Sequence, residues 1–149
     1  MTPLAEALAS IPARRNTLNA LDDQLAQAIQ HIEHVLHEGL KIATPCSITY
    51  DGEDGRFVLA YGKMNGKWVL IWGGEAEDDT QDTALLCAPR GRRAEVFTSD
   101  PTTGMSPMER LLVEAAESLS YYAAMRAPQL ATAKRLIQAL ADAGFPLVA

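Results

Sequence analysis

The sequence predicts an α+β fold, in which an antiparallel β-meander of three to five strands is packed by a long N-terminal helix and C-terminal helices. Three patterns indicate it: a leucine-rich stripe of helical period, an alternating apolar middle with a hairpin signal, and a later helix start. Short turns between consecutive strands leave few other arrangements. We expect residues 1–149 to form a single α+β domain, the usual organisation at this length.

The N-terminal helix is predicted by apolar residues three and four positions apart. Thr2 and Pro3 are typical of an N-cap and a first helical position, and they predict a short helix that Pro12 interrupts or restarts. The long helix then runs from about Ala13 to a stop near Gly39. Its apolar stripe comprises Leu18, Leu21, Leu25, Ile29, Ile32 and Leu36.

The middle of the chain predicts strands. Residues 46–50 alternate in polarity, residues 51–55 supply a turn, and residues 56–64 and 67–73 flank Asn65-Gly66, a pair favoured in two-residue hairpins. The resulting register pairs Lys63 with Trp68, Tyr61 with Leu70 and Leu59 with Trp72. Both hairpin faces are apolar, so we expect one to be covered by helices and the other to be at least partly covered.

The last third of the chain predicts further strands and then helices. Residues 83–88 can form a strand and residues 94–98 a fifth, although a short helix starting at Pro89 is an alternative for the latter. Ser106, Pro107 and Glu109 combine an N-cap, a first helical position and a capping partner, and they predict a helix start. Pro128 is predicted to kink or end this helix before a last one.

Composition favours a folded chain that does not enter a membrane. Apolar residues make up 48% and charged residues 21%, and the longest strongly apolar stretches, residues 57–61 and 68–72, are far shorter than the roughly 20 residues of a membrane span. The N-terminus places arginines after its apolar part, the reverse of a signal peptide. We therefore expect a cytoplasmic location. The net charge of −6 is concentrated in the acidic segment 75–82.

No metal or cofactor site is predicted. His31, His34 and His37 lie off the leucine stripe, and the outer two are spread over about 120° of helix, too wide for one ion to hold all three. The acidic segment lacks the glycine and the spaced carboxylates of a calcium loop, so it is interpreted as a solvated loop. Cys46 and Cys87 are expected to be free thiols.

Function is predicted mainly from the absence of a catalytic motif. The chain contains no nucleophile elbow, phosphate loop or dinucleotide fingerprint, so we expect no catalytic activity. The apolar stripe, about 27 Å long, exceeds strands of about 16–26 Å, so apolar helix surface is left over. We expect an adaptor or regulator that binds another, unidentified protein and forms a homodimer. The interface candidates are Leu4, Leu8, Ile11, Leu136, Ile137 and Leu140.

The alternative is a nucleic-acid-associated protein that uses the aromatic and basic hairpin 56–72 and the PRGRR turn 89–93. Aromatic side chains there could stack on bases while cations contact phosphates. The candidate residues are Arg56, Lys63, Lys67, Trp68, Arg90, Arg92 and Arg93. Because aromatic strand positions are usually core and the acidic segment would repel a polyanion, nucleic acid is the less favoured partner.

Overall fold

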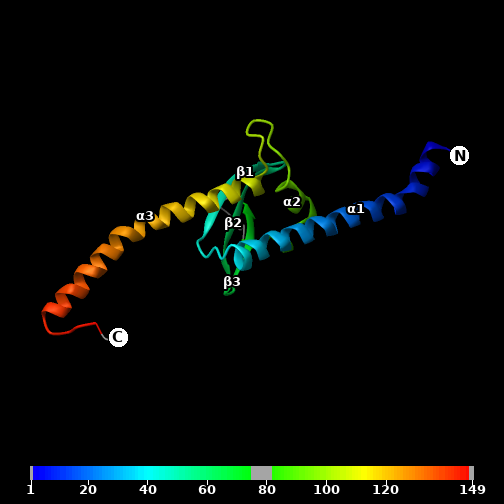
Figure 1. Ribbon diagram of the computed structural model, residues 1–149. Helices are drawn as coiled ribbons and strands as arrows, with labels where there is room; N and C mark the ends of the chain where they lie inside the picture. The colour runs from blue at the N-terminus through cyan, green and yellow to red at the C-terminus, as the bar shows by residue number, and fades with distance from the viewer. Residues whose placement is uncertain (1, 75–81, 148–149) are drawn as a thin grey trace.

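A computed structural model describes residues 2–74 and 82–147. Within these residues four antiparallel strands form one sheet in the order β1-β2-β3-β4, so the predicted α+β fold is confirmed. The elements are α1 (Pro3–His34), η1 (Val35–Gly39), β1 (Cys46–Gly52), β2 (Gly55–Met64), β3 (Lys67–Gly74), β4 (Thr83–Ala84), η2 (Leu85–Cys87), α2 (Arg90–Glu95) and α3 (Pro107–Asp142). Figure 1 shows α1 and α3 extending from the sheet in opposite directions.

The two long helices are each continuous through a proline. Pro12 lies inside α1, so the predicted interruption there is wrong, and Pro128 lies inside α3, so of the predicted kink or end the end is wrong. A proline removes one intrahelical hydrogen bond. Both prolines are exposed, so water can solvate the freed carbonyl, and each helix bends along its outer part (Figure 1).

The predicted hairpin register is confirmed. Lys63 pairs with Trp68, Tyr61 with Leu70 and Leu59 with Trp72. The turn residues Asn65 and Gly66 have φ angles of 52° and 79°, the positive values that a type I′ turn requires.

The core lies on one face of this sheet. The strands contribute the buried side chains of Cys46, Tyr50, Leu59, Tyr61 and Leu70. The helices and turns that cover them contribute Ile29, Leu36, Leu85, Val96, Met108, Leu111 and Ala115. Two polar side chains of this layer find partners: the buried Tyr61 hydroxyl donates to the Ile42 carbonyl at 2.8 Å, and the partly buried Trp72 indole donates to the Tyr50 hydroxyl at 2.9 Å. The opposite face, with Val58, Ala60, Val69 and Ile71, is half-buried and lies outside the core.

The segment after the acidic residues differs from the predicted pair of strands. β4 ends at Ala84 because the next residues form the turn η2, which directs Leu85 into the core. Residues 90–95 form the helix α2, so the alternative of a short helix at Pro89 was right and the fifth strand was wrong. Val96, at the end of α2, is fully buried, which anchors this helix beside the sheet.

Each long helix contributes one charged side chain that hydrogen-bonds to the backbone of a sheet edge, and the two side chains lie at opposite edges. Glu33 of α1 accepts the backbone N–H of Leu70 in β3 at 3.0 Å, beyond the two positions where β4 pairs. Arg110 of α3 donates to the backbone carbonyl of Thr49 in β1 at 3.0 Å. Open strand edges attract other strands, and these contacts satisfy part of each edge.

In residues 2–74 and 82–147 no helix combines the length and the apolarity needed to cross a membrane.

Candidate functional site

The outer parts of the two long helices are largely uncovered in the described chain, and the contact to another element there is the hydrogen bond from Arg90 of α2 to Asn19 at 2.8 Å. We call residues 3–21 the α1 arm and residues 119–142 the α3 arm. Nearly every residue of both arms is exposed or half-exposed. Buried residues of the helices are confined to their inner parts, with Ile29 in α1 and Met108, Leu111 and Ala115 in α3. The arms therefore project from the fold as free helical surfaces.

The sequence-predicted interface residues all lie on these arms. Leu4, Leu8 and Ile11 lie on the α1 arm, and their exposed fractions are 69%, 57% and 49%. Leu136, Ile137 and Leu140 lie on the α3 arm, with exposed fractions of 60%, 45% and 54%. The structure brings each trio together but keeps the trios far apart, because the arms point in opposite directions (Figure 1).

Both arms carry further apolar residues that the sequence assigned to core-facing stripes or did not single out. These are Leu18, Leu21, Leu119, Met125 and Leu130, and all are exposed. In α1 the exposed residues continue the spacing of the buried Ile29 and Leu36 at steps of three, four and seven, so one stripe passes from arm to core. The feature of the sequence that indicated exposed apolar residues was the length of this stripe relative to the predicted strands.

The surface area shows how much of the chain is left uncovered. A compact protein of 16.1 kDa is expected to expose about 7,400 Å². This chain exposes 10480 Å². The excess of about 3,000 Å² is well above the roughly 800 Å² per partner that a standard protein–protein interface buries. The arms thus offer enough surface for a stable interface.

The nucleic-acid candidates do not form one surface. Lys63 and Lys67 lie beside the Asn65-Gly66 turn, whereas Arg56 lies at the opposite end of β2 and donates to the Thr49 hydroxyl. Trp68 is partly buried and stacks on Tyr61 with ring centroids 5.3 Å apart.

The arginines of α2 bond to their own chain. Arg90 contacts Asp22 at 3.7 Å, and Arg93 donates to the Leu86 carbonyl. Arg92 binds Glu95 at 2.8 Å and Asp54 at 3.2 Å, and its guanidinium lies 4.3 Å from the Phe57 ring centroid. The hydrogen bond to Glu95, followed by the nearby carboxylates, keeps the pKa of Arg92 above its ordinary value. These contacts hold the β1-β2 turn against α2. Because carboxylates partly neutralise the positive charges of Arg90 and Arg92, these side chains are less available to bind phosphates.

Side chains that could act as nucleophiles or metal ligands are dispersed among the described residues. Burial raises the pKa of the Cys46 thiol, and the Glu114 carboxylate raises it further, so this thiol stays protonated. Cys87 is a free, exposed thiol. No group of three or more His, Cys, Asp or Glu residues in ranges 2–74 and 82–147 is arranged to hold a metal ion. Of the acidic segment, residues 75–81 lie outside the described residues.

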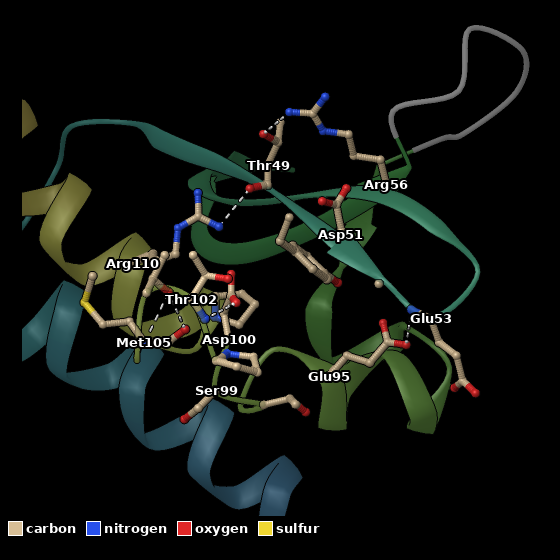
Figure 2. A pocket seen from close by; sticks show the side chains of 16 residues that line it. Thr49, Asp51, Glu53, Arg56, Glu95, Ser99, Asp100, Thr102, Met105 and Arg110 are labelled. Carbon is tan, nitrogen blue, oxygen red and sulfur yellow. Dashed lines mark hydrogen bonds between the residues drawn. The ribbon is translucent and has the colours of Figure 1, made fainter.

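A polar groove of about 840 Å³ runs along the outer edge of β1. Figure 2 shows its two walls: the end of β1 with the following turn on one side, and the loop before α3 with the first turn of α3 on the other. This groove could not be predicted from the sequence, because its walls come from segments about 50 residues apart. Ser106 and Glu109, whose capping box begins α3, orient Arg110 toward β1.

No family model matches this chain, and neither a curated protein nor a solved structure matches it.

Proposed function

We propose that this chain is a cytoplasmic adaptor or regulator without catalytic activity, and that it acts by binding protein through its helical arms. The supporting observation is the continuous apolar stripe of each long helix, which is core at its inner end and exposed at its outer end. Exposed apolar patches of this extent mark interaction surfaces.

A second copy of the chain is the occupant that suits both arms. The arms extend in opposite directions (Figure 1), so a twofold axis across the sheet places the α1 arm of one copy beside the α3 arm of the other. The two helices are then antiparallel, since α1 runs toward the sheet and α3 runs away from it. One self-complementary arrangement thus covers both stripes.

Sedimentation of the full chain at micromolar concentration tests this proposal. We expect a mass of about 32 kDa, twice the chain mass, for a twofold dimer. Leu8→Asp and Leu140→Asp each place a charge in a different stripe, and each is expected to halve that mass. Ala9→Asp and Ala131→Asp are matched controls, because both alanines are exposed on the arms but face away from the stripes.

A wild-type mass of about 16 kDa would reject the dimer. A mass that the controls reduce as much as the stripe variants do would show that arm charge, rather than the apolar stripes, governs association. The nucleic-acid alternative has less support, because four of its arginines bond within the chain. If other cell components co-purify with the chain and are lost on nuclease treatment, that result would favour the nucleic-acid alternative.

A further inference from the structure

The groove in Figure 2 lies against the less protected edge of the sheet. At the opposite edge, β4 pairs with Ile71 and Trp72, and Glu33 accepts the N–H of Leu70. At the β1 edge no strand pairs within the described residues, and the contact to its backbone is the single bond from Arg110 to the Thr49 carbonyl.

The peptide groups that face this groove follow from that one bond. The Thr49 carbonyl accepts from Arg110, so it points away from β2. In an antiparallel strand the N–H and C=O of one residue point the same way, so the Thr49 N–H also points away from β2. Antiparallel pairing has a period of two, so the N–H and C=O of Asp51 and of Ser47 point the same way. Asp51 lies within the groove and Ser47 lies beyond its end.

Two of the carboxylates beside this edge have no partner in the described part of the chain. Glu95 is paired with Arg92, and Asp100 caps the N–H of Thr102. The side chains of Asp51 and Glu53, which flank the open edge, make no hydrogen bond or ion pair there.

The cationic groups of the groove are already engaged. Arg110 donates to the Thr49 carbonyl, and Arg56, which lies opposite Asp51 in the register, donates to the Thr49 hydroxyl. The part of the groove with free backbone groups is therefore also the part with unpaired negative charge.

We propose that this groove binds an extended peptide segment, which adds to β1 as a fifth strand and places a lysine or arginine beside Asp51. The open N–H and C=O groups of Asp51 supply backbone pairing, as in other cases of strand addition. Opposite charges at directly facing positions stabilise a strand pair. The volume of about 840 Å³ is within the range of roughly 300–1,000 Å³ found for binding pockets. The site is separate from the helical arms.

A labelled peptide of alternating threonine and lysine, titrated into the full chain, tests this proposal. Threonine favours the extended state. We expect saturable binding with amide chemical-shift changes at residues 49–53 and 98–105. The same peptide with glutamate in place of lysine tests the charge, and a peptide N-methylated at alternate residues tests the backbone pairing. Both are expected to bind at least about tenfold more weakly.

Two proline variants make a matched pair. Asp51→Pro removes an edge N–H inside the groove, and Ser47→Pro removes the equivalent N–H outside it, while both leave the pairing with β2 intact. Asp51→Pro is expected to abolish binding and Ser47→Pro to leave it unchanged. Asp51→Asn, which keeps the N–H and removes the charge, should weaken binding of the lysine peptide but not of an all-threonine peptide. Circular dichroism confirms that each variant is folded.

The proposal is overturned if the lysine peptide does not bind, if the glutamate or N-methylated peptide binds equally well, or if the shifts fall on the arms. Repeating the titration with the Leu140→Asp variant separates this site from the arms, because groove binding should persist when the arms no longer associate. Loss of binding in that variant would assign the peptide to the arms and reject the groove.

Discussion

The inner and outer halves of α3 carry the same kind of apolar stripe in different surroundings. Met108, Leu111 and Ala115 are buried against β1 and β2, whereas Leu130, Ile137 and Leu140 are exposed at the same helical spacing. α1 repeats this contrast in the opposite chain direction, with Ile29 buried and Leu8 exposed. An apolar stripe stabilises a fold only where a partner covers it, so the inner halves support the fold and the outer halves support association.

The largest expected effect on stability comes from truncating one leucine in each half of α3 and comparing the two variants. Leu111→Ala should lower the free energy of unfolding by about 2–5 kcal/mol, because it opens a cavity in the core. Leu136→Ala, on the exposed arm, should change the stability of the dilute chain by less than about 0.5 kcal/mol.

Urea unfolding followed by the fluorescence of Trp68 and Trp72 measures both variants, since these side chains pack against the core. The Leu136→Ala effect should grow with protein concentration as the arms associate, whereas the Leu111→Ala effect should not. Equal losses in dilute solution would remove the distinction between inner and outer halves.

A second, intermediate effect concerns Glu33, the carboxylate that the inner half of α1 places at the β3 edge. Glu33→Leu should cost about 1–3 kcal/mol, because it leaves the Leu70 N–H without an acceptor. Glu33→Gln keeps an acceptor oxygen and is the matched control. Glu38→Gln, on an exposed side chain of the following turn, should have little effect. A Glu33→Leu variant as stable as the wild type would show that this edge needs no cap.

The pH dependence of Glu33 has a defined sign. Burial raises the pKa of Glu33, and the Leu70 hydrogen bond offsets part of this rise. The folded chain therefore holds this proton more tightly than the unfolded chain, and the contribution of Glu33 to stability falls as pH rises from the unfolded pKa through the folded pKa. Relative to Glu33→Gln, the wild type should gain stability as pH falls through that window. Thermal unfolding of both proteins across acidic pH measures this difference.

The smallest expected effect compares two similar helix starts. Thr2 caps the exposed α1 arm and Ser106 caps the buried start of α3, and each precedes a proline. Ser106→Ala should cost about 0.5–2 kcal/mol in global unfolding, because the Ser106 side chain that caps α3 is buried. Thr2→Ala should fray the end of the arm, seen as faster amide exchange near residue 5, and leave global unfolding unchanged.

Much of the fold could be predicted because its signals are local. Asn65 and Gly66 tolerate positive φ angles and so specify the hairpin and its register. Ser106, Pro107 and Glu109 specify a helix start within a few residues. The exposure of Leu8 and Leu140 on the arms could be anticipated because the apolar pattern of the helices extends over more residues than one small sheet covers.

The features that could not be predicted depend on distant parts of the chain. Pro12 was expected to interrupt its helix and Pro128 to kink or end its helix, yet both helices continue, because the cost of a proline depends on whether the freed carbonyl reaches water, and both lie on exposed arms. The groove was missed because β1 and the loop before α3 meet only in the folded chain. Arg92 was considered for phosphate binding, yet it bonds to Glu95 and Asp54.

By itself the sequence determined the kinds of element and their order, because helical period, strand alternation and turn residues act over a few neighbouring positions. Only the tertiary structure decided which half of each apolar stripe is core and which half is an arm. Leu8 and Ile29 occupy equivalent positions in one periodic pattern, and the difference between them is the sheet that lies beneath the second. Periodicity specifies the face of a helix that seeks a partner, and the length and placement of the sheet decide how much of that face finds one within the chain.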